Sequence, residues 1–118
     1  MENLSNPNDP DELIDAIIFE KYRFLRNIKS HLDIDWPGFE VIRENVLRIS
    51  NGLKIEDMAY FPEKDKHTPA EILQIQTRTY NGTADKFKDV IEVLQTYLST
   101  NDITLLQTAL DSFTKQND

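Results

Sequence analysis

The stretch 68-TPAEILQIQTRTYNGTADKFKDVIEVLQTYL-98 decides the fold class of this chain. Thr68, Pro69 and Glu71 form a capping box with proline at the first helical position, which is specific for a helix start. Apolar side chains then recur at helical spacing and in one phase over the whole stretch. They are Leu73, Tyr80, Ala84, Phe87, Ile91, Leu94 and Leu98. The pattern predicts helix and no strand.

Two alternatives remain open at Asn81-Gly82, in the middle of that stretch. One continuous helix could cover 69–98, with the glycine as its weakest point. A break could instead occur there, with Thr83 capping a new helix. The preserved phase favours the continuous helix.

Three more helices are predicted by the same signals. Asp9-Pro10 starts a helix that runs to about His31, a second follows Asp35 and stops at Asn51-Gly52, and Asn101-Asp102 starts the last. Their stripes are Ile14, Ile17, Ile18, Leu25, Ile28 and Leu32; Phe39, Ile42, Val46 and Ile49; and Ile103, Leu106, Leu110 and Phe113.

A short helical segment at 53–61, ended by Pro62, completes the pattern. We therefore predict an all-α fold, an antiparallel bundle of four main helices plus one short helix. Residues 1–8 are predicted to be a flexible N-terminal tail, and residues 9–118 a single helical domain.

Composition excludes several classes of protein. Thirteen basic and twenty-one acidic residues give a net charge of −8, which argues against nucleic-acid binding and against an anionic membrane surface. The absence of cysteine excludes disulfides and thiolate metal sites and suits a reducing cytoplasm. The first twenty residues carry six acids and no base, the reverse of a signal peptide. An acidic protein of this kind attracts cationic partners.

Catalytic patterns are missing as well. His31 and His67 are the only histidines, and no phosphate loop or His-Glu-x-x-His motif occurs. Carboxylate pairs one helical turn apart, such as Asp11/Asp15 and Asp85/Asp89, are typical of a solvated helix face. We expect no enzyme, no catalytic residue, no cofactor and no metal site.

The segment Asp57-Met58-Ala59-Tyr60-Phe61-Pro62 is more informative. Two adjacent aromatic side chains cannot both face one core, so at least one is expected to be partly exposed. Next to acidic residues, an exposed aromatic ring has the composition of a binding hot spot for a basic protein. The alternative is that both rings tuck under the loop that follows.

The same segment resembles the colicin and pyocin immunity proteins, small acidic inhibitors of nuclease bacteriocins. Their short third helix, Asp-Leu-Ile-Tyr-Tyr-Pro, is similar to residues 57–62, and Thr68-Pro69 and Arg78-x-x-Asn-Gly82 follow at comparable places. The similarity covers roughly residues 39–82.

The resemblance implies binding roles for seven residues. In that family the short helix supplies shared binding energy, which would fall on Asp57, Tyr60 and Phe61. The second helix supplies partner specificity, which would fall on four positions expected to face outward. They are Phe39, Glu40, Arg43 and Leu47.

Three classes of function compete on these grounds. The first is an acidic cytoplasmic inhibitor that binds a basic protein, and the resemblance makes a toxin nuclease the partner class. The second is a helical adaptor or self-associating module, in which the stripe over 69–98 forms the interface of a homodimer. A third, an acidic mimic of DNA, fits the charge but requires carboxylates spaced like phosphates.

Overall fold

The computed structural model describes residues 9–52, 54 and 66–117, and the chain is all-α, as predicted. No strand occurs in these ranges. The elements are α1 (Pro10–Arg26), a 3₁₀ turn η1 (His31–Asp33), α2 (Trp36–Ser50), α3 (Pro69–Lys86), α4 (Lys88–Thr100) and α5 (Ile103–Gln116). None of the described helices is both long enough and apolar enough to cross a membrane. The predicted tail at 1–8 lies outside the described residues, as does the predicted short helix at 53–61 apart from residue 54.

Helix starts follow the local signals in the sequence. The side chain of Asp9 accepts a hydrogen bond from the backbone N–H of Asp11 at 3.0 Å, so α1 starts where the Asp-Pro pair predicts. At α3 the capping box is complete, because the Thr68 hydroxyl accepts from the N–H of Glu71 and the Glu71 carboxylate accepts from the N–H of Thr68. These caps satisfy amide groups that a helix start leaves unpaired.

The end of α1 differs from the sequence-based expectation. The helix stops at Arg26 instead of His31, because Asn27 adopts the left-handed conformation with φ 54°. The N–H of Ile28 then bonds back to the carbonyl of Arg23 at 3.0 Å, which closes the helix in a Schellman turn. Leu32, predicted to continue the buried stripe, is consequently 94% exposed, and the predicted stripe residue Leu25 is also exposed.

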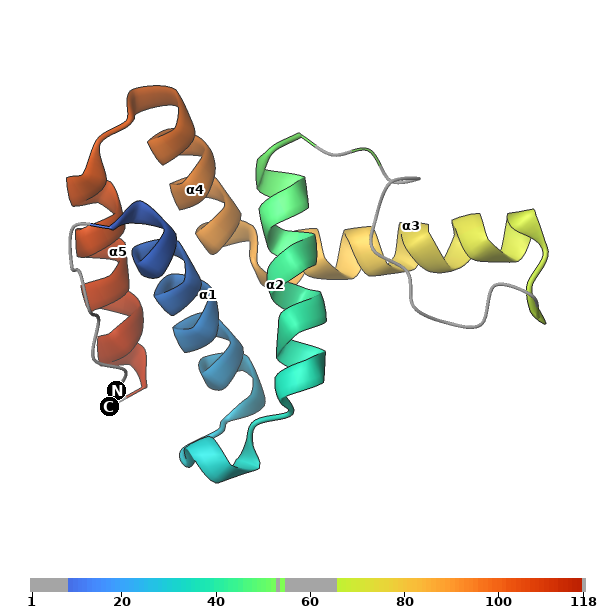
Figure 1. The fold of residues 1–118 in the computed structure, drawn as a ribbon, viewed down its shortest axis with the longest axis horizontal. Helices are drawn as coiled ribbons and strands as arrows, with labels where there is room; N and C mark the ends of the chain where they lie inside the picture. Colours follow the sequence, from blue (N-terminus) through green and yellow to red (C-terminus); the bar gives the residue numbers. More distant parts are fainter. Residues whose placement is uncertain (1–8, 53, 55–65, 118) are drawn as a thin grey trace.

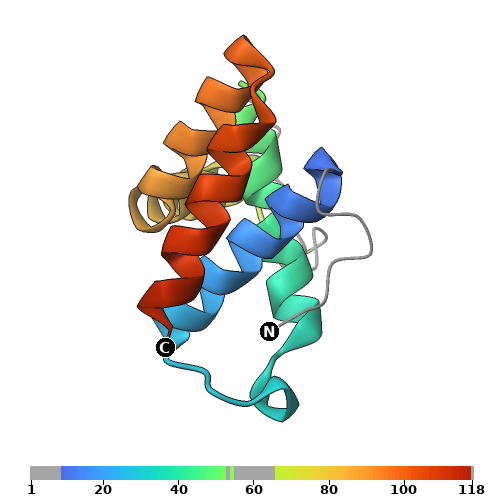
Figure 2. The same cartoon turned by 90° about the vertical axis from the view of Figure 1, so that its left-hand side faces the viewer.

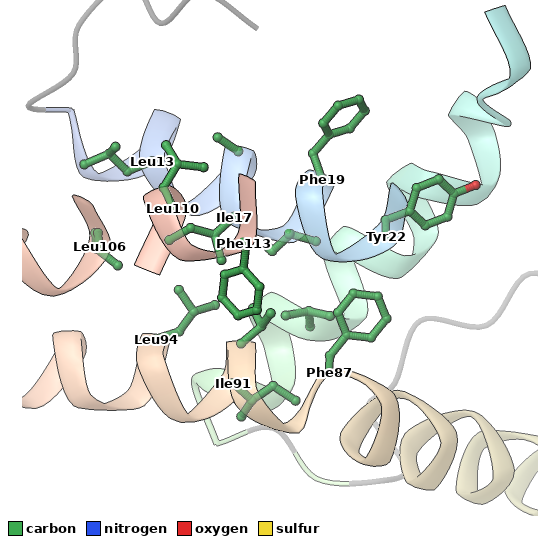
Figure 3. Packing of buried hydrophobic residues seen from close by; sticks show 14 of the residues in the cluster. Leu13, Ile17, Phe19, Tyr22, Phe87, Ile91, Leu94, Leu106, Leu110 and Phe113 are labelled. Atoms are coloured by element: carbon green, nitrogen blue, oxygen red, sulfur yellow. The ribbon is translucent and has the colours of Figure 1, made fainter. Parts of the chain in front are cut away.

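The core is built around α1, which packs against α2, α4 and α5 (Figures 1 and 2). Ile17 and Ile18 have no exposed surface, so adjacent positions of one helix are covered from different sides. Phe113 from α5 and Leu94 from α4 extend toward α1 in the interior (Figure 3). Each such burial contributes about 1.5–3 kcal/mol to the free energy of folding.

A polar contact joins the second half of α1 to the C-terminal end of α5. The buried carboxylate of Glu20 on α1 accepts a hydrogen bond from the Asn117 side chain at 2.9 Å, and Asn117 also donates to the Glu20 backbone carbonyl. The Arg23 guanidinium lies 3.4 Å from the same carboxylate. Paired in this way, the buried charge does not carry the penalty of an isolated ion.

The predicted helix over 69–98 is divided, but not at Asn81-Gly82. Helix α3 runs through these two residues, and the break occurs at Phe87, whose φ and ψ are −109° and 22°. After the break α4 packs against α1, α2 and α5, so burial of its apolar side chains favours the bend over a straight helix. Phe87 stays buried in the core, and α3 turns away from the bundle (Figure 1).

Exposure along the predicted stripe reflects this bend. Phe87, Ile91 and Leu94 are buried, whereas Leu73 near the start and Leu98 near the end are about half exposed. Helix α3 contains no buried residue.

Replacing Gly82 with alanine should stabilise the protein. The glycine lies inside α3, its backbone is not left-handed, and an added Cβ would meet no atom within 4 Å. We expect the Gly82→Ala variant to gain about 0.5–1 kcal/mol in unfolding free energy, measured by urea or thermal denaturation. Gly52 is the matched control, since its φ of +84° makes alanine strained and Gly52→Ala should destabilise. Equal effects of the two substitutions would contradict this account of α3.

Asn45 on α2 is a second site where stability can be gained. Its side chain is buried, and its Oδ1 has no hydrogen-bond partner among the described residues. Leucine has a similar shape and no polar atom, so Asn45→Leu should raise the unfolding free energy by about 1–2 kcal/mol. Asn45→Ala, which leaves a cavity, should give a smaller gain or a loss. A loss with leucine would mean that the amide is satisfied in solution.

Candidate functional site

The first half of α1 carries a concentration of carboxylates. They are Asp9, Asp11, Glu12 and Asp15, and no basic residue lies among them. Acids are favoured at this end by the helix dipole, and the basic residues of α1 follow in its second half. Asp11 and Asp15 lie one turn apart and are both exposed, so they form one acidic edge of the helix.

Phe39, expected to face outward on α2, is buried, and that expectation is wrong. Its ring packs edge-on against Phe19 at 5.5 Å and against Tyr22 at 5.3 Å between ring centroids. Phe39 therefore anchors the start of α2 on α1 and is removed from the candidate binding residues.

The other three predicted residues of α2 lie at or near the surface. Glu40 is exposed, Arg43 is partly exposed, and Leu47 is partly buried against the core. They are three and four residues apart and so share one side of the helix. The Arg43 guanidinium lies 5.8 Å from the centre of the Phe39 ring, which holds it against the outer side of the core.

Arg43 connects this side of α2 with the acidic edge of α1. Its Nη1 lies 3.9 Å from Oδ2 of Asp15. The pKa of the Asp15 carboxyl is raised above its ordinary value of 3.8, mainly because the group is partly buried. The positive charge of Arg43 lowers this pKa and the negative charge of Asp11 raises it, but burial has the largest effect. The two helices thus form one surface, the acidic face, defined by Asp11, Asp15, Glu40, Arg43 and Leu47.

The acidic face can receive a cationic side chain. The face carries three carboxylates and one arginine, of which Asp15 contacts Arg43, so it has an excess of negative charge. The ion pair between Arg43 and Asp15 is long and partly exposed, and pairs of this kind contribute about 0–1 kcal/mol. Both groups can therefore exchange partners at little cost, and Leu47 adds apolar surface beside them.

Three of the predicted binding residues cannot be placed on this surface. Asp57, Tyr60 and Phe61 lie outside the described residues, so their predicted role stays a prediction.

Sequence analysis did not assign Asp15 to a binding site. Its four-residue spacing from Asp11 was recognised, but the same spacing is common on any solvated helix face. The contact with Arg43 depends on how α1 and α2 cross, and no local pattern encodes that crossing.

Within residues 9–52, 54 and 66–117, no cluster of three or more His, Asp or Glu side chains could hold a metal ion. Comparison with protein-family models, curated proteins and solved structures finds no match to this chain. The kind of partner must therefore be inferred from the chemistry of the surface.

Asp15 should lower stability at neutral pH. Because its pKa is raised in the folded protein, the folded state holds this proton more tightly than the unfolded chain, and the unfolding free energy falls as pH rises through and above 3.8. The Asp15→Asn variant has no carboxyl at this position, so its unfolding free energy does not show this decrease with pH. We expect it to be more stable than the wild type at pH 7 by a few tenths of a kcal/mol, since solvent screens a half-exposed carboxyl.

The difference in unfolding free energy between Asp15→Asn and the wild type should disappear when denaturation is measured below the ordinary pKa of aspartate. Both proteins are then uncharged at position 15. Asp33→Asn, at an exposed carboxyl on η1, controls for the loss of one negative charge. A less stable Asp15→Asn variant at pH 7 would mean that the ion pair with Arg43 outweighs burial.

Proposed function

We propose that this protein is a non-catalytic inhibitor that binds a basic protein through the acidic face of α1 and α2. The proposal rests on one observation: Asp15 of α1 contacts Arg43 of α2, and the exposed carboxylates of Asp11 and Glu40 lie one turn from this pair on their own helices, in a chain of net charge −8. Charge of this kind raises association rates with cationic partners and disfavours acidic ones.

A lysine or arginine of the partner would bind between Asp11 and Asp15, where two carboxylates lie one turn apart. Arg43 would then be free to pair with a carboxylate of the partner, so that no charge is left unpaired in the interface. Leu47 would supply apolar contact beside these pairs.

The resemblance to nuclease immunity proteins adds a class of partner, a basic nuclease of the bacteriocin type. Under this proposal the segment with Asp57, Tyr60 and Phe61 continues the binding surface and supplies the aromatic anchors that interfaces commonly use. We place the protein in the cytoplasm, where a chain without cysteine needs no oxidising compartment.

The test compares two doubly substituted proteins with the same change of charge. Asp11→Lys/Glu40→Lys alters the acidic face, and Asp33→Lys/Glu92→Lys alters exposed carboxylates on η1 and α4. Each replaces two acids with two bases and so changes the net charge from −8 to −4. Both proteins and the wild type would be immobilised and incubated with lysate from native cells, and the retained proteins quantified by mass spectrometry.

We expect one cationic protein to be retained by the wild type and by the control, and to be reduced about tenfold or more on the acidic-face variant. With the purified pair, association should slow as salt rises, because charges are screened beyond about 8–10 Å. Equal retention on all three proteins, or loss on both variants, would overturn the assignment of binding to this face.

A further inference from the structure

Helix α3 has a surface that nothing in the described part of the chain covers. Among the described helices it contacts α2 and α4, and its first turns extend away from the bundle (Figure 1). Leu73, on this part of the helix, is 48% exposed. A single exposed leucine is ordinary on a protein surface, so the side chains around Leu73 decide whether this part of α3 forms a contact.

The side chains around Leu73 form a definite face of α3. A shallow depression is lined by Ala70, Leu73, Gln74, Thr77 and Arg78, together with Glu71. Ala70 is small, and the Thr77 hydroxyl already donates to the Leu73 carbonyl at 2.8 Å, so covering it leaves no hydrogen bond unmade. A second helix can therefore approach closely along this line. We call these six residues the α3 face.

The α3 face carries one acidic and one basic residue, and opposite charges would face each other if two copies of the face were placed antiparallel. Glu71 and Arg78 are seven residues apart, so they lie on the same edge of the helix, about 10 Å apart along its axis. Arg78 is exposed and makes no ion pair within the described residues. Hydrogen bonds from Thr68 lower the pKa of Glu71, which keeps its carboxylate charged.

The geometry points to a second copy of this chain as the occupant: we infer that two copies dock their α3 faces antiparallel, with Glu71 of each opposite Arg78 of the other. Residues on the same edge of a helix meet in an antiparallel pair, whereas in a parallel pair opposite edges meet. In a two-fold contact, residue i of one copy contacts residue j of the other copy, and residue j of the first contacts residue i of the second. Glu71 and Arg78 can make this reciprocal pair of contacts. Leu73 and Gln74 would lie near the two-fold axis.

The dimer should be weak. The α3 face covers about three turns of helix, which is less surface than stable protein interfaces bury. We expect a mass near 13.8 kDa in dilute solution and a rise toward twice that value as the concentration increases from about 10 µM to about 1 mM, measured by analytical ultracentrifugation. A constant monomer mass over this range would overturn the inference.

Leucine substitutions locate the interface. Leu73→Asp should abolish the rise in mass, and the matched control Leu98→Asp, at an equally exposed leucine on α4, should leave it unchanged. Both leucines are about half exposed, and circular dichroism would verify that both variants are folded. Loss of the dimer in both, or in neither, would place the contact elsewhere.

Charge exchange tests the antiparallel pairing. Arg78→Glu alone should reduce association about tenfold or more, because it places like charges opposite each other twice. Glu71→Arg/Arg78→Glu should restore association to within about threefold of the wild type, although its capping box is lost and its melting temperature falls. Failure of the double variant to recover would overturn the pairing.

Disulfide formation supplies an independent test, since the chain has no cysteine of its own. Gln74→Cys, near the inferred axis, should form a covalent dimer on mild oxidation. Asn81→Cys lies on the same side of α3 but two turns away, and should not. Equal cross-linking at both positions would indicate a parallel pair and overturn the inference. The proposed function stands or falls separately, because Asp11→Lys/Glu40→Lys leaves the α3 face intact.

Discussion

Ile17 and Ile18 are neighbours in the sequence and neither has any exposed surface, so α1 must be covered on more than one side. The other helices of the bundle take their positions from this requirement. α5 and α4 bury one side of α1 with Phe113, Leu110 and Leu94 (Figure 3). α2 buries another side with Phe39. Together these burials offset part of the conformational entropy lost when the chain becomes ordered.

The bend at Phe87 shows what local sequence could and could not predict. Helix starts, the all-α class and continuity through Gly82 were predicted correctly, because caps and periodicity are local properties. The division of 69–98 was not, since neither proline nor glycine marks it. It follows from tertiary packing, because α4 turns to lie against α1, α2 and α5, and no local pattern encodes that contact. Leu32 was misplaced because the left-handed turn at Asn27 ends α1 early.

For the candidate site, two lines of sequence argument disagreed at Phe39. Helical periodicity placed it in the stripe with Ile42 and Val46, whereas resemblance placed it on the binding surface. Its burial against Phe19 and Tyr22 agrees with the periodicity. Glu40 and Arg43 were identified correctly as accessible, but Asp15 was not linked to them. A pattern along one helix shows which residues share a side, and the neighbour of that side emerges only from packing.

The hydrogen bonds between Glu20 and Asn117 join residues 97 positions apart, and α1 and α5 bury much of the core between them. During synthesis at roughly 5–20 residues per second, α1 emerges about 5–20 s before the helix that covers it. For that interval the side of α1 that packs on α5 lacks its partner, although α2 and α4 can already cover other sides. The order of helices along the chain thus leaves one apolar side of α1 exposed until α5 has been made.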